Sequence, residues 1–93
     1  MGFTQESAVE RAKQDLAKRL KLSESDISEG SVSKVDFPDM SLGAPASGEM
    51  SAQMIATGWK IGLKANGKNY EYRADKYQLR LKDFDGSNHV IVS

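Results

Sequence analysis

The dipeptide Asn66-Gly67 restricts the fold of this chain most strongly, because it predicts a tight hairpin. Both central residues of a type I′ turn have positive φ, a conformation that Asn and Gly tolerate well. Alternating apolar residues flank the dipeptide on both sides: Trp59, Ile61 and Leu63 before it, Tyr70 and Tyr72 after it. A period of two predicts strands with one buried face. We therefore expect two antiparallel strands to meet at this turn.

One helix and further strands complete the predicted fold. Residues 5–21 carry apolar side chains at helical spacing, with Thr4 as the expected N-cap or Ser7 and Glu10 as an alternative capping box. The predicted strands are 32–37, 50–64, 69–74 and 77–82, and 90–92 could add an edge strand. Short turns between consecutive strands favour a meander. We predict an α+β fold, with one N-terminal helix packed on one face of a roughly four-stranded, mostly antiparallel sheet.

The alternation also divides side chains between the two faces of the sheet. Eight residues are expected to face the helix: Trp59, Ile61, Leu63, Tyr70, Tyr72, Tyr77, Leu79 and Leu81. Trp59 is expected to be buried against the helix stripe of Val9, Leu16 and Leu20. A single helix covers only one face, so the other face is expected to stay open unless a partner covers it.

Composition narrows the function classes further. A chain of 93 residues is expected to form one domain, residues 1–93. It has no cysteine and a single histidine, His89, which argues against disulfide scaffolds, cysteine-based zinc sites and thiol nucleophiles. Thirteen basic residues balance thirteen acidic ones, which argues against a strong nucleic-acid binder. No catalytic residue, metal site, cofactor or membrane-spanning segment is predicted.

The loop 38–49 is the first candidate binding site. It contains both prolines and would be long for a small domain, and such loops are often functional. The candidate residues are Asp39, Met40, Leu42 and Glu49. In this interpretation the loop is offered to a partner, as an inhibitor offers a loop to a peptidase. The alternative interpretation places Leu42 in the core and uses Gly43 and Gly48 for turns.

The second candidate is a basic face of the sheet. Alternation directs five side chains away from the helix: Lys60, Lys64, Arg73, Arg80 and Lys82. An open cationic face could hold phosphates or another anion. The alternative is a solvated face whose charges keep the protein soluble and guard the strands. Farther along, Asp83, Asp85 and Asn88 predict an Asx-rich turn, since the glycine and glutamate spacing of a calcium loop is missing.

Several segments together resemble a family of small, mostly exported bacterial domains of unknown function. The resemblance rests on Phe37-Pro38-Asp39, Leu42-Gly43-Ala44-Pro45, Gly58-Trp59-Lys60-Ile61 and Tyr70-Glu71-Tyr72, and it spans roughly residues 8–75. That family usually has cysteine where this chain has Ala44. The resemblance implies an extracytoplasmic location, with a signal removed before Met1, and it implies no particular activity. No signal pattern is found in the first residues.

These patterns favour a non-enzymatic binding or interaction module at the bacterial cell envelope or secreted from the cell. Its partner is expected to be an unknown protein or peptide, and the chain is expected to be a monomer. A peptidase-inhibitor-like domain that presents the loop 38–49 is the alternative. An anion or nucleic-acid binder that uses the basic face ranks below both.

Overall fold

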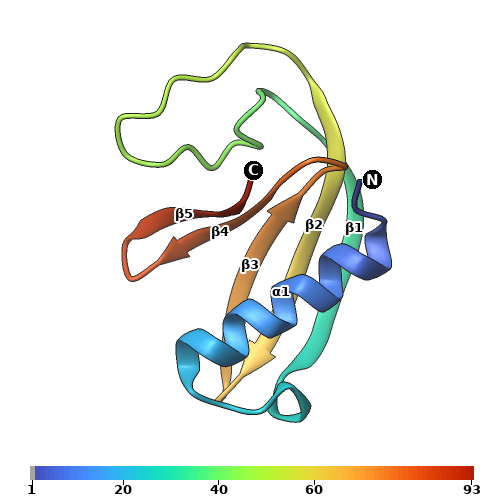
Figure 1. Ribbon diagram of the computed structural model, residues 1–93, viewed down its shortest axis with the longest axis vertical. Coiled ribbons are helices and arrows are strands. Elements are labelled where there is room, and N and C mark those ends of the chain that lie inside the picture. The colour runs from blue at the N-terminus through green and yellow to red at the C-terminus, as the bar shows by residue number, and fades with distance from the viewer. Residues whose placement is uncertain (1) are drawn as a thin grey trace.

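The computed structural model describes residues 2–93, which form one α-helix, one short 3-10 helix and five strands. The helix α1 spans Gln5–Leu20 and η1 spans Glu24–Asp26. The strands are β1 (Ser28–Phe37), β2 (Ala56–Ala65), β3 (Lys68–Ala74), β4 (Leu79–Phe84) and β5 (Ser87–Val92). All neighbours are antiparallel in the order β1-β2-β3-β4-β5, and α1 crosses the sheet (Figure 1). The α+β prediction is confirmed, but the sheet has five strands where four were predicted.

The helix α1 begins where its sequence supplies a capping box. The Thr4 hydroxyl accepts a hydrogen bond from the Ser7 amide at 3.1 Å, and the Thr4 amide donates to the Ser7 hydroxyl at 2.9 Å. These bonds satisfy backbone donors that the first turn leaves unpaired. Thr4 is therefore the N-cap, and the alternative box with Glu10 is not used. The helix ends at Leu20 because Lys21 adopts a left-handed conformation with φ of 56°.

The main core lies between α1 and one face of the sheet. The helix contributes small and branched side chains, and the strands contribute larger ones; the fully buried members include Ala12, Leu16, Ile61, Leu63, Tyr72, Leu79 and Leu81. The Tyr72 hydroxyl donates to Asp15 at 2.7 Å, and Arg19 pairs with the same carboxylate. The polar tip of this buried tyrosine is therefore satisfied.

Two aromatic residues depart from the predicted core. Trp59 is only partly buried and packs at the margin of the main cluster, so the prediction of full burial is wrong. Tyr77 is 72% exposed. The Asp75 carboxylate accepts hydrogen bonds from the amides of Tyr77 and Gln78, which makes this segment an Asx turn. A turn residue has no fixed sheet face, and β4 begins only at Leu79.

Two tight turns build the meander. Asn66 and Gly67 have φ of 53° and 74°, as the predicted type I′ turn between β2 and β3 requires. Asp85 and Gly86 have φ of 52° and 80° and form a second such turn, between β4 and β5. The Asx-rich segment is thus a hairpin turn, and the edge strand begins at Ser87, three residues before its predicted start.

The first two strands also differ from their predicted limits. The strand β1 starts at Ser28 rather than at residue 32, and a bulge at Gly30 lets it continue past the irregular pattern there. The strand β2 starts at Ala56, so residues 50–55 lie outside the sheet. Gly58 lies within β2 with no bulge; a Cβ atom there would collide with the Ala74 carbonyl. This close approach explains the need for glycine.

The long segment between β1 and β2 folds back over the other face of the sheet. We call residues 38–55 the strap; it leaves the end of β1, passes near the ends of β4 and β5, and returns into β2 (Figure 1). A second, smaller core forms beneath it from Phe37, Leu42 and Ala56, with Val35 packed against them. The expectation that this face stays open is therefore wrong for the end that the strap covers.

Candidate functional site

Three of the predicted basic residues form a row on the face of the sheet opposite α1. The register pairs Lys60 with Arg73 and Arg73 with Arg80, which places their side chains side by side across β2, β3 and β4. Opposed residues of antiparallel strands share a face. The neighbouring row of side chains is buried under α1. The structure therefore directs these basic groups toward the strap side of the sheet.

Arg80 is the central anchor of the strap. Its side chain is only 5% exposed, and its guanidinium forms a bidentate ion pair with Glu49, at 2.5 Å from Nη1 and 2.8 Å from Nη2. Nη1 also donates to the Ala44 carbonyl at 3.1 Å, and Nε donates to the Gln78 side chain at 2.7 Å. A planar guanidinium suits such a fork geometry, and a buried cation needs this many acceptors.

Arg73 is the second anchor. Its Nη1 donates to the Leu42 carbonyl at 2.9 Å, and its Nε donates to Glu71 at 2.6 Å. The guanidinium carbon lies 5.4 Å from the centre of the Phe37 ring, which adds a cation–π contact. Gly43 has φ of +66°, and a Cβ atom there would come within 2.6 Å of Arg73 Nη1. The positive φ favours glycine at this position, and a larger residue would displace the Arg73 guanidinium from its place.

The strap is held mainly through its backbone carbonyls. Two further side chains donate to it: Gln78 to the Met40 carbonyl at 2.7 Å, and Asn88 to the Pro45 carbonyl at 2.9 Å. Together with the arginines, donors from β3, the β3–β4 turn, β4 and β5 bind four strap carbonyls: Met40, Leu42, Ala44 and Pro45. Bonds from several elements fix the path of an otherwise irregular segment.

The two acidic candidates of the loop hold the strap together from within. The Asp39 carboxylate accepts hydrogen bonds from the Ser41 hydroxyl and from the amides of Ser41 and Gly43, which lower the pKa of Asp39. Hydrogen bonds from Arg80, and then from the Ala46 amide, lower the pKa of Glu49 to about 2. Both carboxyl groups are ionised near neutral pH, and both oxygens of Glu49 and one oxygen of Asp39 accept hydrogen bonds.

The two predicted sites are therefore one assembly. The strap occupies two residues of the basic face, since Arg73 binds the Leu42 carbonyl and Arg80 pairs with Glu49. Leu42 is fully buried in the second core, as the structural alternative expected. Of the other loop candidates, Met40 is 37% exposed and Glu49 is exposed as well.

The remaining lysines lie beyond the strap. Among residues 2–93, Lys60 and Lys64 form no ion pair, whereas Lys82 pairs with its neighbour Asp83 at 2.8 Å. Lys60 and Lys64 border a shallow hollow of about 530 Å³, floored in part by Gly62. The side chain of Glu71 also lines this hollow, so its charge is mixed.

Three highly exposed aliphatic side chains lie in residues 50–55 of the strap, which were predicted to belong to a strand. Met50 is 95% exposed, Met54 is 63% exposed and Ile55 is 73% exposed. We call these three residues the strap patch. The three residues lie within six consecutive positions of the chain, and exposed apolar surface often marks an interaction site. The sequence did contain a signal for this exposed apolar segment. No charged residue occurs between Glu49 and Lys60, and a long loop precedes the strand.

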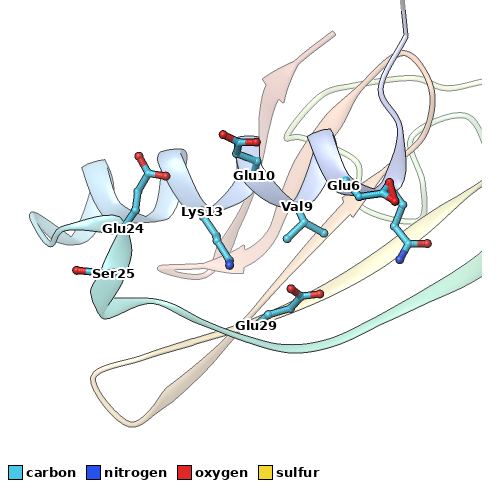
Figure 2. Close-up of a pocket in the computed structure, with 8 residues that line it drawn as sticks. Glu6, Val9, Glu10, Lys13, Glu24, Ser25 and Glu29 are labelled. Atoms are coloured by element: carbon cyan, nitrogen blue, oxygen red, sulfur yellow. The ribbon is translucent and has the colours of Figure 1, made fainter.

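A hollow of about 520 Å³ lies between α1, η1 and the start of β1, and Figure 2 shows the side chains that line it. Four of them are glutamates: Glu6, Glu10, Glu24 and Glu29. Lys13 and Val9 border the same hollow. Within residues 2–93, no three His, Cys, Asp or Glu side chains are grouped so that they could share a metal ion. The acidic hollow therefore lacks the arrangement of a metal centre.

No helix of the described chain is long and apolar enough to cross a membrane. No curated protein and no solved structure matches the chain. A family model described as a domain of unknown function, DUF8738, matches residues 9–81, a span that includes the strap and both of its arginine anchors. The chain therefore belongs to the DUF8738 family.

Proposed function

We propose that the protein is a non-enzymatic binding module that contacts a protein or peptide through the strap patch of Met50, Met54 and Ile55. Its place of action is proposed to be the bacterial cell envelope or the extracellular medium, on the resemblance of Leu42-Gly43-Ala44-Pro45 and its flanking segments to exported domains. The proposal assigns the strap the role of presenting the contact residues and assigns the sheet the role of holding the strap.

The carrying observation is that exposed apolar side chains lie in a segment held between Glu49 and the start of β2 at Ala56, with the Ala52 carbonyl bound by the Met40 amide at 3.0 Å. The three side chains are 63–95% exposed, while Arg80 and Glu49 form a partly buried ion pair beside them in the chain. Apolar surface in water has an unfavourable free energy that a partner removes on binding. A backbone fixed before binding loses less conformational entropy in the complex. Methionine also adapts to varied partner surfaces.

The chemistry of the strap supports a role without catalysis. Its two carboxyl groups have lowered pKa values, whereas a general base works best with a pKa near the working pH. The Ser41 hydroxyl donates to Asp39 rather than to a histidine. The only histidine is His89 on β5. Its Nε2 lies 3.1 Å from the carbonyl oxygen of Phe84 on β4.

The test is a selection of peptides from a displayed random library on the wild-type protein. Peptides that bind are expected to lose affinity for a variant with Met50→Ser, Met54→Ser and Ile55→Ser. They are expected to keep their affinity for the matched control Lys60→Glu with Lys64→Glu, which changes an exposed region away from the patch. Chemical-shift changes confined to residues 50–55 would support the proposal. Equal binding to both variants, or no enrichment on the wild type, would contradict it.

A peptidase inhibitor is the second candidate. Residues 50–55 are uncharged and largely exposed, and no turn or bend interrupts them. Peptidases that bind substrates as strands would accept such a segment through backbone hydrogen bonds. In this proposal the segment that enters the peptidase is residues 50–55, whereas the sequence had suggested the loop 38–49. Incubation with a panel of peptidases should then show inhibition that the Met54→Asp variant abolishes; cleavage of the strap as an ordinary substrate would contradict this candidate.

A further inference from the structure

Within residues 2–93, every methionine belongs to the strap. The chain has four methionines and no cysteine. Three of the four are Met40, Met50 and Met54, which all belong to the strap, and the fourth, Met1, lies outside the described residues. Both hydrophobic cores are built from aliphatic and aromatic side chains without any methionine. Thioether chemistry within residues 2–93 can therefore occur only on the strap.

The three strap methionines differ in their access to solvent. Met50 is 95% exposed and Met54 is 63% exposed, whereas Met40 is 37% exposed. The backbone of Met40 is also held on both sides: its amide donates to the Ala52 carbonyl, and its carbonyl accepts from Gln78. An oxidant in solution reaches an exposed sulfur more easily, so reactivity is expected to follow exposure.

We propose that Met50 and Met54 are sites of reversible oxidation, and that this modification changes the strap patch from apolar to polar without unfolding the domain. In the reaction a peroxide transfers one oxygen atom to the thioether sulfur while its O–O bond breaks. The sulfur is oxidised by two electrons to the sulfoxide, and the peroxide is reduced to water or an alcohol. A sulfoxide reductase reverses the step with two electrons from a thiol reductant, which is oxidised to a disulfide while the oxygen atom leaves as water.

The fold is expected to survive because neither modified side chain supports it. The strap is anchored through Arg73, Arg80, Gln78 and Asn88, and none of these bonds involves a methionine side chain. A sulfoxide carries a strong dipole that prefers water, so a modified patch is a poorer apolar contact surface. Oxidation is also expected to weaken binding of the partner, and this consequence rests on the proposed function. The oxidation of Met50 and Met54 and the survival of the fold do not depend on it.

Peroxide titration followed by mass mapping of proteolytic peptides tests the sites. Oxidation of Met50 and Met54 is expected before that of Met40, and thermal unfolding of the doubly oxidised protein is expected to match that of the reduced protein. Oxidation of Met40 as fast as of Met50, or a clearly lowered melting temperature, would overturn the inference.

Retention on a phenyl-substituted resin tests the change in the patch. Reduced wild-type protein is expected to be retained severalfold more than its oxidised form, and sulfoxide reductases should restore retention. The variant Met50→Leu with Met54→Leu keeps the apolar surface without oxidisable sulfur, so peroxide should leave its retention unchanged. Retention that persists after oxidation of both methionines would overturn the inference. If reduced wild-type protein is retained no better than the triple serine variant, the proposed function itself fails.

Discussion

Arg80 joins the sheet to the strap more directly than any other described residue. Its guanidinium contacts the Glu49 carboxylate, a strap carbonyl and a side chain of the β3–β4 turn. The hydrogen bonds of a buried charge are worth more than those of an exposed one, because no water replaces them when they are lost. The strap's position therefore depends on this one side chain to an unusual degree.

Arg80→Met should lower the free energy of unfolding by about 1–3 kcal/mol, since Glu49 and the Ala44 carbonyl lose their donor. Glu49 is partly exposed and can regain water, which keeps the loss below that of a fully buried pair. The matched control Lys82→Met removes an exposed pair with Asp83 and should cost at most about 1 kcal/mol. Urea unfolding of the three proteins measures both values. Equal losses for the two variants would show that the strap is not held by Arg80.

The sequence predicted which face of the sheet a side chain occupies only within strands, where apolar and polar residues alternate. Alternation correctly placed Arg73 and Arg80 on the face opposite α1. It gave no information on what covers that face, because strap contacts join residues more than 30 positions apart in the chain. It also misplaced Tyr77, whose side chain lies in an Asx turn rather than in a strand.

The β2–β3 hairpin is the element that the sequence specified best. Its turn supplies positive φ at Asn66 and Gly67, and its strands are the two central partners of the main core. Turn chemistry and the buried pattern agree on one register, and a slip by one residue would exchange the faces. This agreement holds only at the turn end of the hairpin, because β2 begins at Ala56 rather than at residue 50.

Gly67→Val should lower the free energy of unfolding by about 1–3 kcal/mol, because a β-branched residue at φ of 74° is strained. No atom lies within 4 Å of a Cβ placed there, so the loss would come from the backbone conformation alone. Lys68→Val is the matched control, since it adds the same side chain to an ordinary strand position. It should change stability by less than about 0.5 kcal/mol. Equal midpoints in chemical denaturation would contradict the observed turn.

The β4–β5 hairpin shows why the edge strand was predicted only as a possibility, over residues 90–92, and with a late start. Asp85-Gly86 carries the same turn signal as Asn66-Gly67, but polar residues surround it and no strict alternation follows. The register shifts between Leu81 and Phe84, where Asp83 has φ of 53°. A bulge of this kind interrupts the period of two without ending the strand pairing. Turn chemistry alone would have identified this strand.

At the scale of the whole molecule, the strap links stability to pH. Glu49 has its pKa lowered to about 2, below its ordinary value of 4.5, so the unfolded chain binds the proton more tightly than the folded protein. This stabilisation is present above pH 4.5 and is lost as the pH falls toward 2. The lowered pKa of Asp39 acts in the same direction.

Glu49→Gln should therefore lower the melting temperature at neutral pH, and its difference from the wild type should shrink as the pH falls from 4.5 to 2. Thermal unfolding followed by circular dichroism at several pH values in this range measures the difference. The variant Glu10→Gln, which changes an exposed glutamate on α1, serves as the control and should run parallel to the wild type. A constant difference between the Glu49 variant and the wild type would show that the ion pair does not set this dependence.

The distribution of charge leads to the last prediction, that the protein binds single-stranded nucleic acid only weakly. The net charge is zero, and two of the five residues of the basic face are occupied by the strap. Lys82 is paired, so mainly Lys60 and Lys64 remain for phosphates. Each phosphate contacted on a single strand contributes a slope of about −0.7 to the logarithmic salt dependence, so two contacts give about −1.4.

Titration of a labelled oligonucleotide at about 50 and 150 mM salt should give this shallow slope and no micromolar affinity at the higher salt. Tyr72 and Phe37 cannot stack on bases, because Tyr72 is buried under α1 and Phe37 is buried beneath the strap. Lys60→Glu with Lys64→Glu should abolish the binding that remains at low salt, whereas Lys18→Glu on α1 should leave it largely intact. Micromolar or tighter binding at about 150 mM salt that the double variant removes would show that the two lysines form a built anion site. The basic face, rather than the strap patch, would then be the principal contact surface of the molecule.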